Sequence, residues 1–234
     1  MEQKHLVVLT SAGISAESGL STFRDSSGLW TKVDAMELAS IQGYRKNRER
    51  VLDFYNDRRK NLLSVEPNHA HQVLAELEKE YRVSIITQNV DDLHERAGSS
   101  KVLHLHGELR KVTGSKNPND EKCIHEMPLD QPIEIGDKAP DGSQLRPFVV
   151  LFGENVPNIP AGTRLCKEAD IFVVIGTSLA VYPAATLIGF VQPKTPCYII
   201  DPGDFDEKSL NGFEHIKTTA VKGIEILKEK LYTK

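Results

Sequence analysis

Short runs of apolar residues, many of them β-branched, recur along the chain with stretches of helical periodicity between them. The runs are nearly continuous rather than alternating, which is typical of strands buried on both faces of a parallel sheet. They predict strands over residues 5–10, 83–87, 148–152, 171–175 and 197–200.

Helical periodicity is clearest after Pro67, where apolar residues follow the i, i+3, i+4, i+7 spacing of one helix face. Residues 221–231 predict a second amphipathic helix, and the highly charged stretch over 47–63 predicts a third. Because buried strands alternate with helices, we predict an α/β fold, a Rossmann-like doubly wound parallel sheet. Ligands of such a sheet bind beyond the carboxyl ends of its strands.

Two segments interrupt this alternation. Residues 26–66 contain no convincing strand and indicate a helical insertion. Residues 111–147 are rich in Pro, Gly, Asp, Asn and Lys and are too long for an ordinary connection, which indicates a small irregular module. We therefore predict a single domain over 1–234, with a large Rossmann-like part at about 1–25, 82–110 and 148–234, a helical insertion at about 26–81 and the irregular module at about 111–147.

The charge, the cysteine spacing and the length of the apolar runs indicate which classes of protein this chain fits. The 234 residues include 29 Lys and Arg against 33 Asp and Glu, a formal charge of −4 that disfavours binding to nucleic acid. Cys123, Cys166 and Cys197 are widely spaced, which fits a reducing compartment rather than a disulfide framework. The apolar run near the amino terminus is too short for a secretory signal, and no run is long enough to span a bilayer. We expect a cytoplasmic, soluble protein that binds neither nucleic acid nor membrane.

The loop after the first predicted strand has the small residues that a phosphate cradle requires. Ala12, Gly13, Ser15 and Ala16 would allow close approach of a pyrophosphate at a helix start. Ser11 stands where the dinucleotide fingerprint has its first glycine, so a tight turn without a ligand remains the more ordinary explanation of this loop alone. No acidic residue ends a second strand about 20 positions further on, which disfavours a standard hydride-transfer enzyme.

Three polar clusters follow predicted strands or lie close to them: Gln88, Asn89 and Asp91; His104, His106 and Gly107; and Gly176, Thr177 and Ser178. Each has an ordinary structural explanation, because Asn89 or Asp91 could cap a helix and a single buried histidine is more often structural. Histidine is also the usual general base near neutral pH. The joint placement of the clusters indicates an active site.

Taken in chain order, five segments resemble the motifs of the sirtuins, the NAD-dependent protein-lysine deacylases. The segments are SAGISAESGLSTFRD, TQNVDDLHERAG, HLHG, RPFVVLFGE and VVIGTSLAVYPAA. The resemblance extends from about Val7 to the end of the chain and leaves residues 111–145 unmatched. Five motifs in the family's order make it highly specific. It implies the family's fold and the consumption of NAD as a co-substrate.

The resemblance also implies roles for matching positions. His106 would be the general base, and Asn89 and Asp91 would position the ribose and carboxamide for departure of nicotinamide. Residues 150–154 would offer an edge for strand addition by the substrate backbone. The other NAD-binding positions would be Ala12, Gly13, Ala16, Phe23, Arg24, Gln88, Gly176, Thr177, Ser178, Asp201 and Ala220, and the edge residues that bind substrate would be Val150, Phe152, Gly153 and Glu154.

The family's reaction gives these groups a chemical purpose. The acyl-lysine carbonyl oxygen attacks C1′ of the nicotinamide ribose as nicotinamide leaves. His106 takes a proton relayed from the ribose 2′-hydroxyl, which then attacks the acyl carbon, and water releases free lysine and O-acyl-ADP-ribose. A histidine acts as a base only while it is neutral, so its pKa should lie near or below the operating pH.

One pair of residues bears on the acyl group. Tyr55 and Arg58 are spaced i, i+3 on the predicted helix over 47–63, and a guanidinium beside a hydroxyl suits a terminal carboxylate. Spacing alone favours a solvated basic helix face, because other Arg and Lys residues surround the pair. The Tyr-x-x-Arg pattern, however, is similar to that of desuccinylase-type (class III) sirtuins, which implies succinyl- and malonyl-lysine as substrates, with some deacetylation.

The irregular module departs from the family pattern. Sirtuins usually carry two Cys-x-x-Cys pairs for a structural zinc, whereas residues 108–147 contain only Cys123. Asp120, Glu121 and His125 lie nearby, but their spacing does not predict a closed site. We predict a degenerate zinc-ribbon module without zinc.

Two other functions on the same scaffold stay open. One is mono-ADP-ribosyl transfer, in which a side-chain nucleophile intercepts the activated ribose. The other is a non-catalytic NAD or ADP-ribose sensor, against which the presence of a base at His106 argues. We expect a monomer whose partners are acylated lysines of proteins or peptides.

Overall fold

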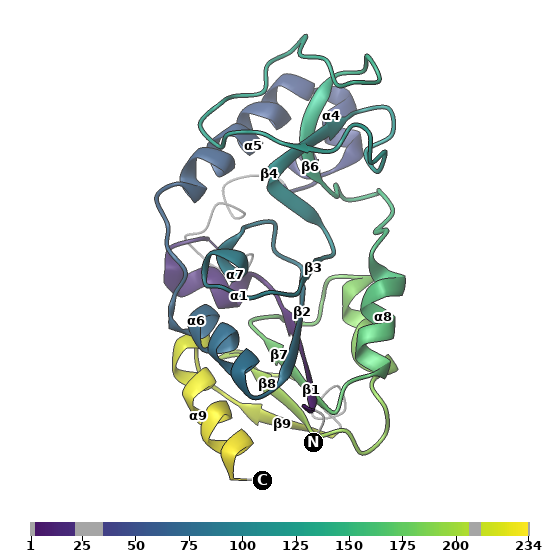
Figure 1. Ribbon diagram of the computed structural model, residues 1–234. Coiled ribbons are helices and arrows are strands. Elements are labelled where there is room, and N and C mark those ends of the chain that lie inside the picture. Colours follow the sequence, from purple (N-terminus) through teal and green to yellow (C-terminus); the bar gives the residue numbers. More distant parts are fainter. Residues whose placement is uncertain (1–2, 22–34, 206–211, 234) are drawn as a thin grey trace.

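A six-stranded, fully parallel sheet forms the larger part of the molecule (Figure 1). The computed structural model describes residues 3–21, 35–205 and 212–233. The strand order is β3-β2-β1-β7-β8-β9, so the chain winds outward in one direction from β1 and in the other from β7. The strands are β1 (His5–Thr10), β2 (Arg82–Thr87), β3 (Val102–His104), β7 (Ile171–Ile175), β8 (Cys197–Ile200) and β9 (Phe213–Ile216). A doubly wound sheet leaves its ligand crevice where the winding reverses, here between β1 and β7.

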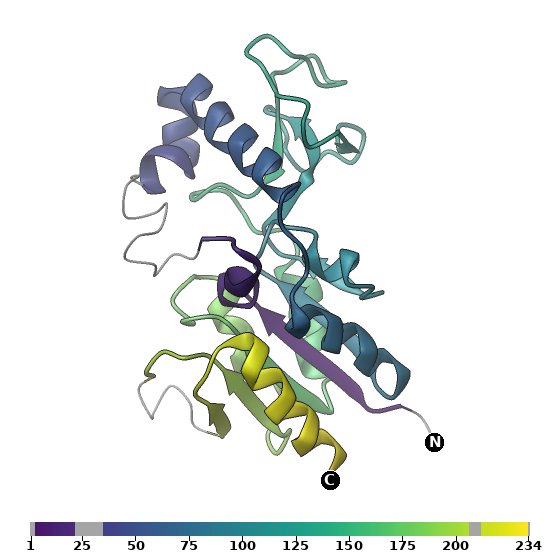
Figure 2. The ribbon, with the colours of Figure 1, turned by 90° about the vertical axis from the view of Figure 1, so that its left-hand side faces the viewer.

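Helices cover both faces of this sheet, which explains why the strands are apolar throughout. On β1, Leu6 and Val8 face a core that includes α6 (His69–Glu76) and α9 (Ala220–Tyr232). The alternate residues Val7 and Leu9 face a second core that includes α8 (Ile159–Lys167). Figures 1 and 2 show α6 and α9 on one side of the sheet, and Figure 1 shows α8 on the other. Each fully buried side chain of this size contributes about 1.5–3 kcal/mol to folding.

A smaller module lies beyond the carboxyl ends of the parallel strands (Figure 2). Its antiparallel sheet has the order β5-β4-β6. The module shares one core between this sheet and the helices, and its elements are β4 (Gly107–Gly114), β5 (His125–Glu126), β6 (Leu145–Val149), α3 (Ala35–Leu38), α4 (Ile41–Lys46) and α5 (Arg48–Leu62).

Short elements complete the described chain. They are the helices α1 (Ala12–Ser15) and α7 (Leu93–Arg96) and the 3₁₀ turns η1 (Ala16–Ser18), η2 (Leu77–Lys79) and η3 (Ala184–Phe190). Across the described ranges, no helix combines the length and the apolar character that crossing a bilayer demands.

The predicted fold class is confirmed, and one predicted strand is wrong. The strands expected at 5–10, 171–175 and 197–200 have those bounds, and β2 begins one residue earlier than expected. The run at 148–152 is not a parallel strand, because β6 ends at Val149 and pairs antiparallel with β4. An apolar run indicates burial but does not specify the partner strand.

Helix α6 lies inside the predicted helical insertion at 26–81, yet it packs with the large part. Its buried residues Ala70, Val73 and Leu74 belong to the same core as β1 and β2. Asn68 begins this helix by accepting a hydrogen bond from the Ala70 amide, as an N-cap does. The helical insertion therefore ends before α6.

A buried arginine on α5 holds the irregular part of the small module. Arg59 is 0% exposed, and its Nε donates to the carbonyl of Leu109 at 3.2 Å. Its Nη1 and Nη2 donate to the carbonyls of Gln131 at 2.6 Å and Pro128 at 2.7 Å. A segment without regular structure must pair its buried carbonyls elsewhere, and here one side chain of α5 pairs several of them.

Replacing Arg59 by Met should destabilise the whole domain. The change leaves buried carbonyls unpaired, at about 1–3 kcal/mol for each, so we expect the free energy of unfolding to fall by about 3 kcal/mol or more. Urea unfolding followed by circular dichroism measures this. The control is Lys60→Met at the next position, an exposed residue expected to change stability by less than about 0.5 kcal/mol. Equal stability of the two variants would contradict the role of Arg59.

Candidate active site

The loops after β1 and β7 meet where two glycines touch. The amide of Gly13 donates to the carbonyl of Gly176 at 2.9 Å, and the amide of Ser11 donates to the carbonyl of Ile175 at 3.1 Å. A Cβ on Gly13 would lie 2.5 Å from the Gly176 Cα, and Gly176 has a φ of +68° that favours glycine. The small residues of this loop are therefore required for contact between the two loops, in addition to any ligand.

The loop after β2 carries the second polar cluster, and hydrogen bonds hold it on several sides. Gln88 donates its amide to the carbonyl of Thr10 at 2.9 Å, and Asn89 donates its amide to the hydroxyl of Thr87 at 3.0 Å. Asn89 Nδ2 also donates to the Oγ of Ser15 at 3.1 Å. The first two sequence motifs therefore meet in space at this loop.

Ser15 joins two of the predicted residues, whereas the sequence indicated it only as a small residue of the loop after β1. Its hydroxyl accepts from Asn89 and donates to Asp91 Oδ2 at 3.1 Å. The other oxygen of Asp91 accepts from the Leu93 amide at 3.3 Å, but the N-cap of α7 is Asp92 and not Asp91 or Asn89. Burial raises the pKa of Asp91, while these two hydrogen bonds act to lower it. The SAGIS motif was the available signal, because Ser15 is one of its small residues.

His106 has the geometry of a neutral base. Its Nδ1 lies 3.0 Å from the carbonyl oxygen of Gln88, and because a carbonyl only accepts, Nδ1 must carry the proton. Nε2 then holds a lone pair. Burial lowers the pKa of His106, which keeps the ring neutral near neutral pH. The ring is half-buried, and His106 lies two residues after the end of β3.

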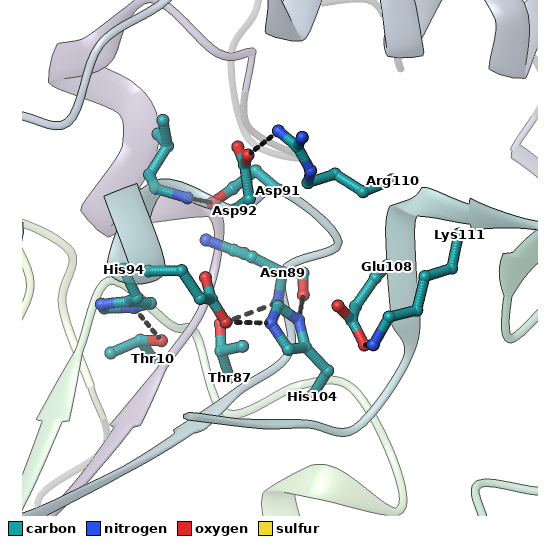
Figure 3. Close-up of polar contacts among 12 residues, drawn as sticks. Thr10, Thr87, Asn89, Asp91, Asp92, His94, His104, Glu108, Arg110 and Lys111 are labelled. Carbon is teal, nitrogen blue, oxygen red and sulfur yellow. Dashed lines mark hydrogen bonds and ion pairs between the residues drawn. The ribbon is translucent and has the colours of Figure 1, made fainter. Parts of the chain in front are cut away.

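His104 and His106 contact adjacent carbonyls of the loop after β2, as the alternation of the HLHG motif predicted. Its Nδ1 is 3.0 Å from the carbonyl oxygen of Asn89 (Figure 3). Gly107 follows with a φ of +79°, and a Cβ there would lie 2.1 Å from the carbonyl oxygen of Phe148. The glycine thus permits the chain to pass directly from the histidines into β4.

Tyr55 and Arg58 lie on α5 and interact with one another. Tyr55 is buried, and burial raises the pKa of its hydroxyl, which therefore remains protonated. Burial also lowers the pKa of Arg58, while the charge of Arg58 interacts with Tyr55 and with the Asp91 carboxylate. The Arg58 guanidinium carbon is 5.7 Å from the centre of the Phe54 ring. The solvated helix face that spacing alone favoured is thus wrong for Arg58 and Arg59, while Arg45, Lys46, Arg48, Arg50 and Lys60 are exposed.

Several backbone amides of the predicted substrate edge are already hydrogen-bonded within the chain. The amide of Val150 donates to the carbonyl of His106 at 2.9 Å, and that of Phe152 to the carbonyl of Ala39 at 2.8 Å. The amide of Leu151 donates to Glu154 Oε2 at 2.8 Å. Strand addition along the whole of 150–154 is therefore not available, whereas Gly153 is exposed at its turn with a φ of +92°.

Glu154 has an internal role. Its carboxylate accepts two hydrogen bonds from Arg146, at 2.7 and 3.1 Å, and Arg146 is almost fully buried. A bidentate pair of this kind fixes direction as well as distance. Glu154 therefore holds the turn that presents Phe152 and Gly153.

The residues predicted to bind the adenosine half of NAD differ in their surroundings. Thr177 Oγ1 accepts from the Leu179 amide at 3.1 Å, and Asp201 Oδ1 accepts from the Gly203 amide at 2.8 Å. The side chain of Ala220 is part of the core under the sheet. Ala12, Ala16, Gly176 and Ser178 are partly exposed beside the crevice, while Phe23 and Arg24 lie outside the described residues.

Glu17 makes contacts in this region that the sequence did not indicate. Its carboxylate accepts from the Val221 amide at 2.9 Å and from the Thr219 hydroxyl at 3.2 Å. A carboxylate at a helix amino terminus is stabilising, so Glu17 ties the loop after β1 to the start of α9. The only signal for it was its place in the AESG segment, which also suits an exposed turn.

The small module does not fit a four-cysteine zinc site. Cys123 is buried, and within the described residues no group of three His, Cys, Asp or Glu side chains is arranged to hold a metal. The His125 Nδ1 pairs instead with the Cys123 carbonyl at 3.0 Å. The hydrogen bonds of Arg59 provide the cross-links of this module.

Comparisons with known proteins show which family the chain resembles. A model of the Sir2 family matches residues 11–183. The chain is 52% identical over 229 residues to an NAD-dependent protein deacylase of Bacteroides thetaiotaomicron, covering 97% of this chain and 98% of that one. It is 51% identical over 228 residues to an NAD-dependent protein deacylase of Helicobacter pylori, covering 97% of each. The solved structure of a Sir2 homologue–NAD complex matches with a TM-score of 0.85 at 38% identity, over 99% of this chain and 91% of that one.

Metal removal should leave the protein folded. We predict that the module binds no zinc, and side chains of α5 hydrogen-bond its irregular part. We therefore expect a strong zinc chelator to shift the melting temperature by less than about 1 °C, well below the several degrees that a 1 kcal/mol loss produces. Scanning fluorimetry with elemental analysis of the same sample checks this. Stoichiometric zinc together with a large drop in melting temperature would show that a metal site exists.

Proposed function

The chain belongs to the Sir2 family, and we propose that it is an NAD-dependent protein deacylase that removes succinyl and malonyl groups, and also acetyl groups, from lysine side chains. NAD is consumed, and the products are nicotinamide, the free lysine and an O-acyl-ADP-ribose. We also propose that the protein acts as a cytoplasmic monomer on acylated proteins or peptides and binds neither nucleic acid nor membrane. Its net charge of −4 supports the last point.

The residues at the crevice fit NAD. The contact of Gly13 with Gly176 keeps side chains out of the place where the winding of the sheet reverses. Asn89 and Asp91 are neighbours there and share the hydroxyl of Ser15. An amide and a carboxylate held in fixed positions can orient a ribose and a carboxamide before reaction, which is the main contribution that positioning makes to rate.

His106 supports catalysis over simple binding. Its proton is held on Nδ1 by Gln88, and its lowered pKa leaves Nε2 able to accept a proton from a ribose hydroxyl. A sensor that only binds NAD has no use for a base prepared in this way. The same geometry serves ADP-ribosyl transfer less well, because that reaction needs no deprotonation of the 2′-hydroxyl.

The preference for acidic acyl groups depends on Arg58. This half-buried guanidinium interacts electrostatically with both Tyr55 and Asp91, so it belongs to the site and not to the solvated helix face. A terminal carboxylate reaching this position would meet a cation and a protonated hydroxyl, the donors that recognise carboxylates. The neighbouring Arg59 is committed to backbone carbonyls and is not available for this purpose.

The peptide backbone would bind along the turn at Phe152 and Gly153. The Arg146–Glu154 pair holds this turn, and the amides of 150–152 are bonded within the chain. Recognition is therefore limited to a short stretch on each side of the acyl-lysine. Backbone recognition of this length tolerates many sequences.

The test compares one peptide carrying succinyl-, malonyl- or acetyl-lysine, with products identified by mass spectrometry. We expect succinyl removal with O-succinyl-ADP-ribose formed, and no product from His106→Ala. In Arg58→Met, loss of a charged hydrogen bond worth about 1.5–3 kcal/mol should lower kcat/KM for the succinyl peptide about 10- to 100-fold. The same variant should change kcat/KM for the acetyl peptide by less than about threefold, because an acetyl group has no carboxylate.

Lys60→Met, an exposed change on the same helix, is the matched control and should alter neither substrate. Efficient acetyl removal without succinyl removal would refute the role of Tyr55 and Arg58. A peptide that gains the mass of ADP-ribose would indicate the transferase instead. NAD binding without nicotinamide release would indicate the sensor.

A further inference from the structure

His104 precedes the base by two residues and has no part in the reaction proposed above. Its ring is buried, with Nδ1 3.0 Å from the carbonyl oxygen of Asn89 and Nε2 2.8 Å from Glu95 Oε1. Figure 3 shows the ring directed at Asn89. A carbonyl and a carboxylate both only accept hydrogen bonds, so two donors are needed on the ring. The imidazolium form alone satisfies both partners.

The two histidines of the HLHG motif therefore differ in protonation because of their partners. His106 contacts one acceptor, the carbonyl of Gln88, and remains neutral. His104 contacts the next carbonyl along the same loop and, in addition, the carboxylate of Glu95. One extra acceptor on α7 thus converts the same side chain from a base into a fixed cation.

The charges around His104 come from several elements. Glu95 lies on α7 and Glu108 on β4, where Lys111 pairs with Glu108 at 2.7 Å. Asp91 also interacts with the ring, and His94 is buried with its pKa lowered well below the usual value, first by burial. Burial of His104 acts to lower its pKa, but the hydrogen bond and charge of Glu95, with Glu108, raise it above 6.5.

Hydrogen bonds hold both the backbone and the side chain of Asn89. Its amide donates to Thr87 at 3.0 Å, its Nδ2 donates to Ser15 at 3.1 Å, and its carbonyl accepts from His104. Loss of the His104 contact would free the peptide plane that joins Asn89 to the residues leading to Asp91. A shift of about 1 Å in a positioned group can reduce rate about 100-fold.

We propose that His104 is a positioning residue, which as an imidazolium anchored by Glu95 holds the Asn89 carbonyl and thereby orients Asn89 and Asp91 for reaction. This inference rests on the proposed deacylase function. His104 would itself touch neither NAD nor the acyl group.

The proposal implies a pH limit on the alkaline side. A raised folded-state pKa means that the contact is complete below the unfolded value of about 6.5 and is lost as the pH rises through the folded value. When one proton leaves, the Glu95 carboxylate retains the remaining proton on Nε2, because that hydrogen bond is charge-assisted. Nδ1 then presents a lone pair to the Asn89 carbonyl, and the positioning contact fails.

Three substitutions of His104 distinguish the roles of its two hydrogen bonds. The amide nitrogen of His104→Asn can replace Nδ1 and donate to Asn89, whereas that of His104→Gln replaces Nε2 and reaches only Glu95. We expect kcat to fall about 10- to 100-fold in His104→Leu and His104→Gln and to be largely restored in His104→Asn. KM for the acyl peptide should stay unchanged, since the ring does not face the peptide edge. The alkaline limb of the wild-type kcat profile should be absent in His104→Asn.

A second readout does not need activity. The imidazole resonances of His104, followed by NMR, should titrate above the ordinary histidine pKa in the wild type and at lower pH in Glu95→Gln. The control is His69→Asn, which breaks the surface pair of His69 with Glu225 at 2.6 Å and should change neither kcat nor the titration.

A His104→Asn variant as impaired as His104→Leu would overturn the proposal, as would rescue by Gln in place of Asn. A wild-type titration of His104 at or below the ordinary value would also overturn it. Failure of the proposed function looks different, because the wild type would then release no nicotinamide with any acyl peptide while the NMR titration would still decide the state of His104.

Discussion

The backbone carbonyls of Gln88 and Asn89 are the constraint on which the rest of the site depends. β2 ends at Thr87, and the parallel pairing of Thr87 with His104 brings the HLHG segment beside this loop. Each carbonyl then meets the Nδ1 of one histidine, at 3.0 Å in both cases. A carbonyl can only accept, so the backbone places a proton on Nδ1 of both rings. The proposed base and the groups proposed to hold the ribose are thus positioned by the same short loop.

Two consecutive arginines of α5 make different contacts. Arg59 points into the module and pairs backbone carbonyls of a segment without regular structure. Arg58 interacts with Tyr55 and with the buried Asp91. Because both residues are on α5, the helix that holds the module also carries the group proposed to read the acyl chain. On this proposal, the stability of the module and the choice of substrate depend on the same helix.

Much of the fold was predictable because burial on both faces leaves a continuous apolar run, as in β1 and β7, whose bounds were predicted correctly. The run at 148–152 was assigned to the wrong sheet, since periodicity reports burial and not the partner strand. β3 and β9 were missed because they are short and lack such a run. In the site, motifs predicted roles for His106, Asn89 and Asp91. The contacts of Ser15, Glu17 and His104 depend on how separate elements pack together and could not be inferred from the sequence.

The central claim is that adjacent carbonyls and one carboxylate leave His106 neutral and His104 charged. The most direct measurement is a ¹⁵N–¹H correlation spectrum of the imidazole nitrogens at neutral pH, with each ring assigned by substitution. The account predicts a neutral Nδ1-protonated tautomer for His106 and two protonated nitrogens for His104. A protonated Nε2 on a neutral His106, or the same protonation state in both rings, would contradict it.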